Sequence, residues 1–168
     1  SSIVKGIAKT FVEMAKSRNI TFLSKIPEQV MWNSDKGFLN TIIINLISNA
    51  FKYTPDGQSI KIEVDTSGEN MLTLRVANEG STIKEKDFQY IFNRYAILDN
   101  FENQDEKNFS RNGLGLAISY NMAKLLNGTL KVENTPDGWV MFTLTLPVVE
   151  LTTGVVETKR LTAEYIPK

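Results

Sequence analysis

The stretch that decides the fold of this chain reads Asn45-Leu46-Ile47-Ser48-Asn49-Ala50-Phe51-Lys52-Tyr53-Thr54-Pro55. It lies in an apolar helical segment, yet its two asparagines, its lysine and its tyrosine fall within an arc of about 100° on a helix. Asparagine is a poor residue for a helix interior, because its side chain competes for backbone hydrogen bonds. Two asparagines one turn apart therefore indicate a polar binding stripe on a helix that is otherwise buried.

The composition excludes several kinds of site. The 168 residues include 19 basic and 19 acidic side chains, and a net charge of zero does not support a nucleic-acid surface. The chain has no histidine and no cysteine, which excludes imidazole bases, phosphohistidine, disulfides and thiolate metal sites within it. No signal peptide is visible, and no apolar run approaches the ~18 residues that a membrane span needs. We therefore expect a soluble domain without direct membrane contact.

Hydrophobic periodicity predicts helices that alternate with hairpins. Helical spacing covers residues 3–16, about 35–53 and 114–126, with a short helical piece around 87–94. Alternation predicts strands at 59–66, 71–77, 129–133 and 139–146, and two short strands at 20–23 and 30–32. The predicted class is α+β, a two-layer sandwich of a mixed, mostly antiparallel sheet covered on one face by helices.

Two segments stand outside this pattern. Residues 99–112 are polar and have almost nothing to bury, and a loop of this length inside a compact domain is usually functional or disordered. We expect one domain over residues 1–147, with a mobile lid over about residues 96–112. Residues 148–168 follow Pro147 without clear periodicity and are expected to be a tail or linker.

The polar stripe is suited to a metal–phosphate site. An amide oxygen of Asn45 or Asn49 is a hard ligand that can hold Mg²⁺ without adding charge, while the metal binds phosphate oxygens. Lys52 lies one turn further on, where it can meet phosphates, and Tyr53 offers a ring to a base or sugar. The alternative is that both asparagines simply bond to neighbouring loops.

Three other motifs are candidates for binding. Asn112-Gly113-Leu114-Gly115-Leu116 places two glycines at a predicted helix start, where backbone amides can approach a phosphate. Asn78-Glu79-Gly80 ends a strand in a turn whose polar side chain can read a base edge, although a plain turn with Gly80 at positive φ is the alternative. Phe92 and Arg94 stand at the base of the predicted lid and Arg111 lies within it, or they are ordinary core and surface residues.

In this order, the motifs resemble the ATP-binding catalytic domain of sensor histidine kinases, in the GHKL superfamily that also includes gyrase, mismatch-repair ATPases and large heat-shock chaperones. The resemblance covers about residues 3–147. Residues 45–55 resemble the N box, 78–83 the first glycine box, 88–95 the F box and 112–116 the second glycine box. The N box and the second glycine box are the specific parts.

The resemblance implies that ATP lies between the N-box helix and the lid. Asn49 would be the principal Mg²⁺ ligand, with Asn45 beside it, Lys52 would contact phosphate, and Arg94 would sense the γ-phosphate. The amides of Gly113 to Gly115 would hold phosphates. The remaining nucleotide contacts implied by the boxes are Tyr53, Asn78, Gly80, Ile83, Phe92, Arg111, Asn112, Leu114 and Leu116.

The implied reaction transfers the γ-phosphoryl group to a histidine on a dimerisation domain N-terminal to this segment. An aspartate on a response regulator receiver domain would accept it next. A cytoplasmic position, as the intracellular part of a membrane-bound sensor, follows from the same resemblance. Since this chain has no histidine, we expect it to bind ATP without labelling itself.

Two positions refine this expectation. Superfamily ATPases place a glutamate at position 45 to activate water, and Asn45 cannot act as a base, which favours transfer to a partner. The first glycine box usually opens with an aspartate that binds the adenine amino group. Here Asn78 stands in its place and Thr82 replaces a second glycine, so we expect weaker ATP binding.

Two other functions remain open from the sequence. The first is a degenerate nucleotide-binding sensor that does not turn over. The second is an anti-sigma-type serine kinase, whose N box usually carries the glutamate that is absent at position 45.

Overall fold

The computed structural model describes residues 2–27, 36–66, 70–80, 82–88, 91–92, 106–147 and 158–162. The helices are α1 (Ser2–Ser17), α2 (Lys36–Tyr53) and α4 (Glu106–Leu125), and η1 (Glu85–Asp87) is a single 3₁₀ turn. The strands are β1 (Thr21–Lys25), β2 (Ser59–Asp65), β3 (Met71–Glu79), β4 (Thr129–Asn134), β5 (Trp139–Pro147) and β6 (Lys159–Arg160).

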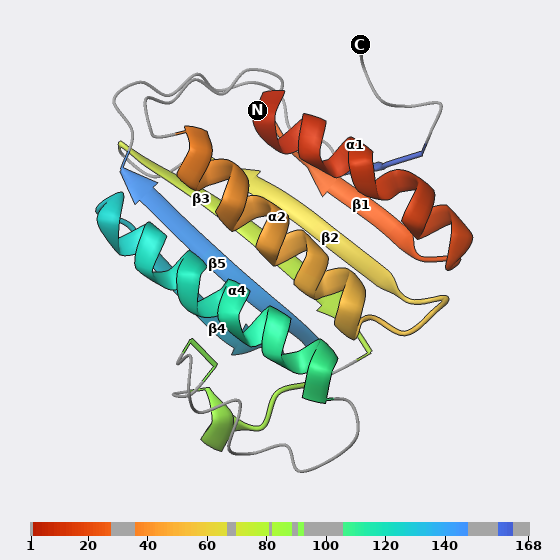
Figure 1. Ribbon diagram of the computed structural model, residues 1–168. Helices are drawn as coiled ribbons and strands as arrows, with labels where there is room; N and C mark the ends of the chain where they lie inside the picture. Colours follow the sequence, from red (N-terminus) through yellow and green to blue (C-terminus); the bar gives the residue numbers. More distant parts are fainter. Residues whose placement is uncertain are drawn as a thin grey trace.

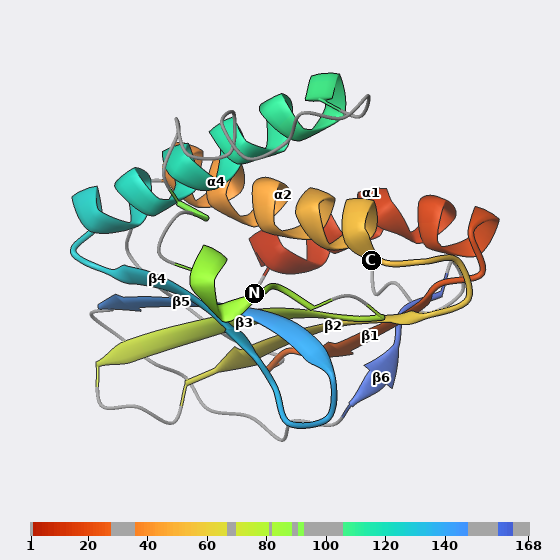
Figure 2. The ribbon, with the colours of Figure 1, turned by 90° about the horizontal axis from the view of Figure 1, so that it is seen from below.

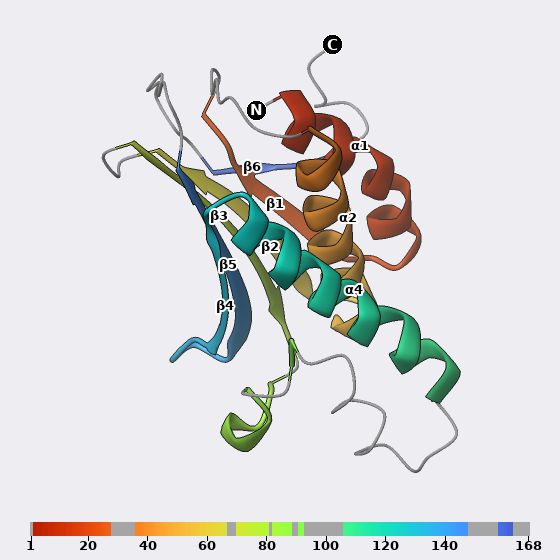
Figure 3. The same ribbon diagram turned by 60° about the vertical axis from the view of Figure 1, so that its left-hand side comes forward.

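The strands form one sheet in the order β4-β5-β3-β2-β1-β6. Strands β1 and β2 pair in parallel, and the other pairs are antiparallel. Figures 1 and 3 show α1, α2 and α4 side by side on one face of this sheet. The predicted α+β sandwich, with a mixed and mostly antiparallel sheet covered on one face, is therefore confirmed.

The core lies between the helices and the sheet. Apolar residues at helical spacing pack there against apolar residues that alternate along the strands. In α2, Leu39, Ile43 and Ile47 recur at four-residue spacing and are at most 1% exposed, so this stripe faces the sheet. In β2 and in β3 as far as Val76, every second residue is buried and its neighbours are half-buried, and Ala77 and Asn78 near the end of β3 are both buried. The edge-on view in Figure 2 shows the resulting two layers.

The opposite face of the sheet carries charge. Arg75 on β3 lies across from Glu63 on β2 and donates to its carboxylate over 3.2 Å, and it approaches Asp65 at 3.5 Å. Cross-strand pairs of opposite charge support the register that the buried face already requires. In the described parts of the chain, no helix is both long enough and apolar enough to cross a membrane.

The structure differs from the sequence prediction at the start of α4. This helix begins at Glu106, eight residues before the predicted Leu114, so residues 106–112 are helical. The prediction relied on apolar periodicity, which these residues lack, but none of them is a proline and a formed helix propagates at little cost per residue. The part of the predicted lid over residues 96–105 lies outside the described residues.

The predicted C-terminal tail also contributes to the sheet. Lys159 and Arg160 pair antiparallel with Ser24 and Leu23 of β1, so part of residues 148–168 adds an edge strand. Two residues are too few to show an alternating pattern, which is why the sequence did not reveal them. The predicted strand at 30–32 lies outside the described residues. Of the predicted helical piece at 87–94, the described part is turn apart from Asp87, the last residue of η1.

Two glycines in this fold should respond oppositely to alanine. At Gly128, between α4 and β4, a Cβ atom would lie 2.3 Å from the backbone oxygen of Thr145, whereas nothing lies within 4 Å of one at Gly6 in α1. We expect Gly128→Ala to lower the free energy of unfolding by about 1–3 kcal/mol through overpacking. Gly6→Ala should raise it by up to about 1 kcal/mol. Urea denaturation of both variants measures the difference, and equal midpoints would contradict this packing at Gly128.

Candidate nucleotide site

The central feature of the site is a buried oxygen on α2. Asn49 is 4% exposed, and its Oδ1 atom has no hydrogen-bond partner among the described residues. A buried acceptor without a partner costs about 1–3 kcal/mol, so such groups are rare and call for an explanation. An oxygen held in this way is suited to a cation or another ligand that supplies the missing interaction.

Asn45, one turn earlier, joins α2 to α4. Its Nδ2 atom donates to the backbone oxygen of Gly115 at 3.2 Å and to Oγ of Ser119 at 3.0 Å. Ser119 is fully buried, and this contact gives its hydroxyl a partner. Because Nδ2 is engaged in this way, Oδ1 is the atom of Asn45 that can meet a metal or phosphate-bound water.

The second glycine motif lies inside a helix. Gly113 and Gly115 are within α4, so the prediction that they open a helix is wrong. Amides in the body of an α-helix donate to the carbonyl four residues earlier, and this helix does not present them to a phosphate. Gly115 has a different role here, because its backbone oxygen accepts a hydrogen bond from Nδ2 of Asn45. A Cβ atom at this position would make only ordinary van der Waals contact with Asn45, at 3.4 Å from Cγ.

Lys52 and Tyr53 form the last turn of α2. The Nζ atom of Lys52 lies 5.7 Å from the centre of the Tyr53 ring, and both side chains are half-buried. Burial raises the pKa of Tyr53 from 10.0 to about 12, because ionisation would place a charge in a poorly hydrated position. This end of the helix thus offers a cation beside a neutral ring.

The end of β3 packs against the segment that follows α2. Asn78 is 2% exposed, and Gly80 adopts φ +86°, as the turn prediction required. A Cβ atom at Gly80 would lie 3.0 Å from Cδ of Pro55. The structure therefore brings the first glycine motif against the end of the N-box motif.

Ile83 is held by a side chain that sequence reasoning missed. Nδ2 of Asn134 donates to the backbone oxygen of Ile83 at 2.6 Å, and the Ile83 amide donates to Oδ1 of Asn134 at 3.1 Å. The side-chain amide of Asn134 thus gives the backbone of Ile83 the two hydrogen bonds that a neighbouring strand would otherwise supply. The two positions are 51 residues apart in sequence, and no motif spacing points to the pair.

Other predicted residues take structural roles or lie outside the described part. The ring of Phe92 stacks on Tyr120 with centroids 5.1 Å apart, and the buried Leu116 belongs to the core. Arg94 is outside the described residues. Only the backbone is described for Arg111, Asn112 and Leu114, so their predicted contacts stay predictions. Among the described residues, no three acidic, histidine or cysteine side chains cluster as a metal site would require.

Taken together, the site lies where the C-terminal half of α2, the end of β3 and the N-terminal half of α4 converge (Figure 1). Contacts within 3.5 Å connect α2 to α4 through Asn45, and the segment after α2 packs on Gly80. Among the side chains that the structure describes there, the polar groups are amides, the Ser119 hydroxyl, the Lys52 ammonium and the Tyr53 phenol. Such groups can bind and orient an anionic ligand with a hard cation, but they include no general base on the described side chains.

Comparison with known proteins shows the family of the chain. Residues 34–150 match the family of histidine kinase-, DNA gyrase B- and HSP90-like ATPases. The chain belongs to this family. Among its relatives, it is 32% identical to the sensor histidine kinase TmoS of Ectopseudomonas mendocina over 148 residues and 29% identical to the sensor histidine kinase WalK of Bacillus subtilis over 140 residues.

These matches cover 88% and 82% of the chain but only 15% and 22% of the two relatives. The fold is similar to a nucleotide-free catalytic domain of histidine kinase ThkA, with a TM-score of 0.73, 23% identity, and coverage of 88% of this chain and 91% of that one. Full-length ShkA in complex with AMPPNP gives a TM-score of 0.73 at 18% identity, over 91% of this chain and 30% of that one.

The burial of Tyr53 gives a pH-dependent test of the site. Since its folded-state pKa is raised from 10.0 to about 12, its contribution to stability is complete below pH 10 and is lost as the pH rises toward 12. The free energy of unfolding should therefore fall more steeply over this interval in the wild type than in Tyr53→Phe. Urea denaturation at several pH values measures the two slopes. Parallel slopes would show that Tyr53 ionises as it does in water.

Proposed function

We propose that this chain is the ATP-binding catalytic domain of a two-component sensor histidine kinase. It would bind Mg²⁺-ATP and donate the γ-phosphoryl group to a histidine on a separate dimerisation domain. The support comes from the family match, from relatives that are sensor histidine kinases, and from the buried oxygen of Asn49 without a partner. That oxygen is the single observation within this chain that most favours a metal–nucleotide ligand.

The described residues fit a magnesium ion. Asn49 Oδ1 is a neutral, hard donor that lacks a partner, and Asn45 Oδ1 would lie one turn away on the same side of α2. When bound, Mg²⁺ supplies neutralisation of the phosphate charge. Asn49 would hold the ion and Lys52 would place its ammonium toward the phosphates. Tyr53 would pack near the nucleotide with its hydroxyl protonated.

The first glycine motif would receive the base. Asn78 lies near the end of β3, Gly80 follows that strand beside Pro55, and Asn134 binds the backbone of Ile83. Phosphate contacts from Gly113 to Gly115, with Asn112, Leu114 and Leu116 around them, require the first turns of α4 to unwind. Arg94 in the F box would sense the γ-phosphate, Phe92 would support it, and Arg111 would reach the phosphates from the lid.

Asn45 favours transfer over hydrolysis. Its amide cannot accept a proton from water, and its Nδ2 atom is already bound to α4. The acceptor would be the dimerisation-domain histidine, and a response regulator receiver domain would follow. A complex of ThkA with its response regulator TrrA provides a precedent in a protein of the same fold. We place the domain in the cytoplasm, as part of a membrane-bound sensor.

The alternatives are less well supported. The relatives named above are sensor histidine kinases, which does not favour an anti-sigma-type serine kinase. A degenerate nucleotide sensor differs from the proposal in turnover and shares its binding site. Supplying γ-labelled ATP and a histidine-bearing dimerisation domain distinguishes the two, since only the kinase transfers label to that domain.

Asn49→Ala tests the metal ligand. We expect this change to weaken binding of a non-hydrolysable ATP analogue with Mg²⁺ by about tenfold to a hundredfold, since a hydrogen-bonding partner of a charged group contributes about 1.5–3 kcal/mol. Isothermal titration calorimetry measures the affinity. Asn121→Ala on the exposed side of α4 is the matched control. Wild-type affinity in the Asn49 variant, with thermal unfolding unchanged, would refute the proposed role.

Asn78→Asp tests the departure in the first glycine motif. A carboxylate that accepts from the adenine amino group forms a charge-assisted bond roughly twice as strong as that of an amide. We expect the variant to bind Mg²⁺-ATP several times more tightly than the wild type. Purine riboside triphosphate, which lacks the amino group, should show no gain. An equal or lower affinity of the variant for ATP would count against adenine recognition by residue 78.

A further inference from the structure

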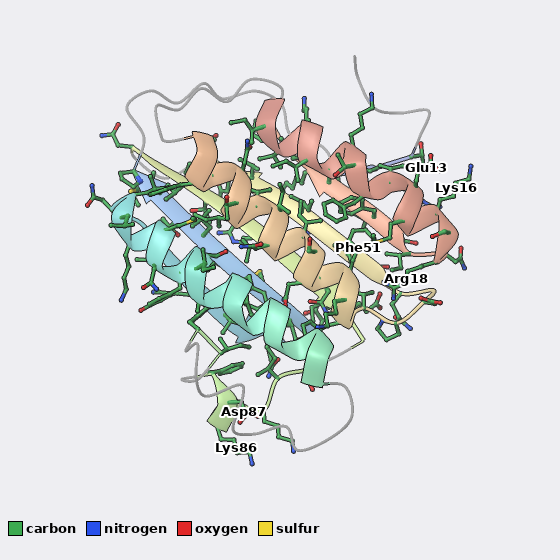
Figure 4. All side chains as sticks on the ribbon, in the orientation of Figure 1. Glu13, Lys16, Arg18, Phe51, Lys86 and Asp87 are labelled. Atoms are coloured by element: carbon green, nitrogen blue, oxygen red, sulfur yellow. The ribbon has the colours of Figure 1, made fainter. Side chains whose placement is uncertain are left out.

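Arg18 lies in the turn after α1 and reaches the far end of α2. One terminal guanidinium nitrogen of Arg18 donates to the backbone oxygen of Phe51, and the other donates to that of Thr54 at 2.5 Å. Its Nε atom donates to Oδ1 of Asp56 at 2.7 Å. Figure 4 labels Arg18 and Phe51 near the adjoining ends of α1 and α2.

These contacts supply what a helix end lacks. The last four carbonyls of an α-helix have no partner within the helix, and a cation at this end also meets the negative end of the helix dipole. The oxygen of Ala50 accepts from the amide of Thr54 at 3.0 Å and from its Oγ1 at 2.6 Å. Arg18 donates to the next carbonyl oxygen that has no partner within the helix, that of Phe51. It also donates to the carbonyl oxygen of Thr54, which follows the helix.

The same helix end is fixed by packing and by backbone bonds. The ring of Phe51 stacks on Phe11 of α1 with centroids 5.4 Å apart and meets Phe22 of β1 edge-on at 5.3 Å. The amide of Gly57 donates to the backbone oxygen of Arg18 at 3.2 Å. The turn after α1 and the end of α2 therefore form one connected unit.

Lys52 and Tyr53 lie between the two carbonyls that Arg18 holds. We infer that Arg18 is a positioning residue for the nucleotide site, which fixes the last turn of α2 so that Lys52 and Tyr53 face the ligand. Arg18 itself does not belong to the site, since its guanidinium is occupied by the two carbonyls and Asp56. This inference rests on the proposed nucleotide site at the end of α2.

The carbonyl contacts, rather than the ion pair, should carry this role. The Asp56 side chain is 72% exposed, and an exposed ion pair contributes little because water and salt screen it. The fork of the guanidinium is what allows one side chain to serve two carbonyls at a fixed separation. A side chain with one donor group serves only one of them.

The test compares variants at the two helix ends by calorimetry with Mg²⁺ and a non-hydrolysable ATP analogue, below the unfolding temperature. We expect Arg18→Ala to bind about tenfold more weakly, which corresponds to about 1.4 kcal/mol. Arg18→Gln, which keeps one donor group, should lie between this variant and the wild type. Asp56→Asn should bind as the wild type does, as should Lys16→Ala, which removes an exposed charge from the last turn of α1.

A second readout separates positioning from general stability. Loosening the last turn should expose Tyr53. The pKa of Tyr53, read from tyrosinate absorbance, should therefore move in Arg18→Ala from about 12 toward 10.0, whereas Lys16→Ala should leave this pKa unchanged. If the Arg18 variants lose thermal stability but keep the wild-type affinity and titration, the residue is only structural and the inference fails. Should Arg18→Ala not fold, the Arg18→Gln affinity decides in the same way. Absence of nucleotide binding by the wild type would instead refute the proposed function.

Discussion

The structure depends on the packing of α2, which turns its apolar stripe to the sheet and an adjacent polar side to α4. Its apolar stripe, with Leu39, Ile43 and Ile47 at most 1% exposed, is held against the sheet, so the helix cannot rotate without exposing it. The rotation of the helix in turn directs Asn45 and Asn49 toward α4. The polar groups keep their positions because the hydrophobic face fixes them, and the cost of a buried Asn49 oxygen is offset by that face.

The elements with strong periodicity were predictable from sequence. The stripe of α2 and the alternation of β2, β3 and β5 gave both the type of element and the class of fold, because burial follows directly from these patterns. The start of α4 was not predictable in this way, since residues 106–112 carry no apolar repeat. The two residues of β6 are recognisable only through their pairing with β1.

For the site, the residue types were predictable from sequence, but the contacts that hold these residues in place were not. The paired asparagines and the turn glycine at position 80 follow from local chemistry. The roles of Arg18, Ser119 and Asn134 come from contacts with residues that are 33 to 74 positions away. Such contacts have no signature in one sequence, because any exposed arginine or asparagine looks the same until the fold brings a partner to it. Gly115 was noticed for phosphate binding, and the hydrogen bond that its backbone oxygen accepts from Asn45 is visible only in three dimensions.

The short strand β6 has a consequence for how this domain is handled. It pairs with β1 along the side of that strand that β2 leaves open, so the main chain of β1 has neighbours on both sides over this stretch. Ending the polypeptide at Pro147 would remove this cover and leave a row of unpaired amides and carbonyls at the sheet margin. Open margins of this kind recruit strands from other molecules. By pairing with β1, Lys159 and Arg160 therefore limit self-association through this margin of the sheet.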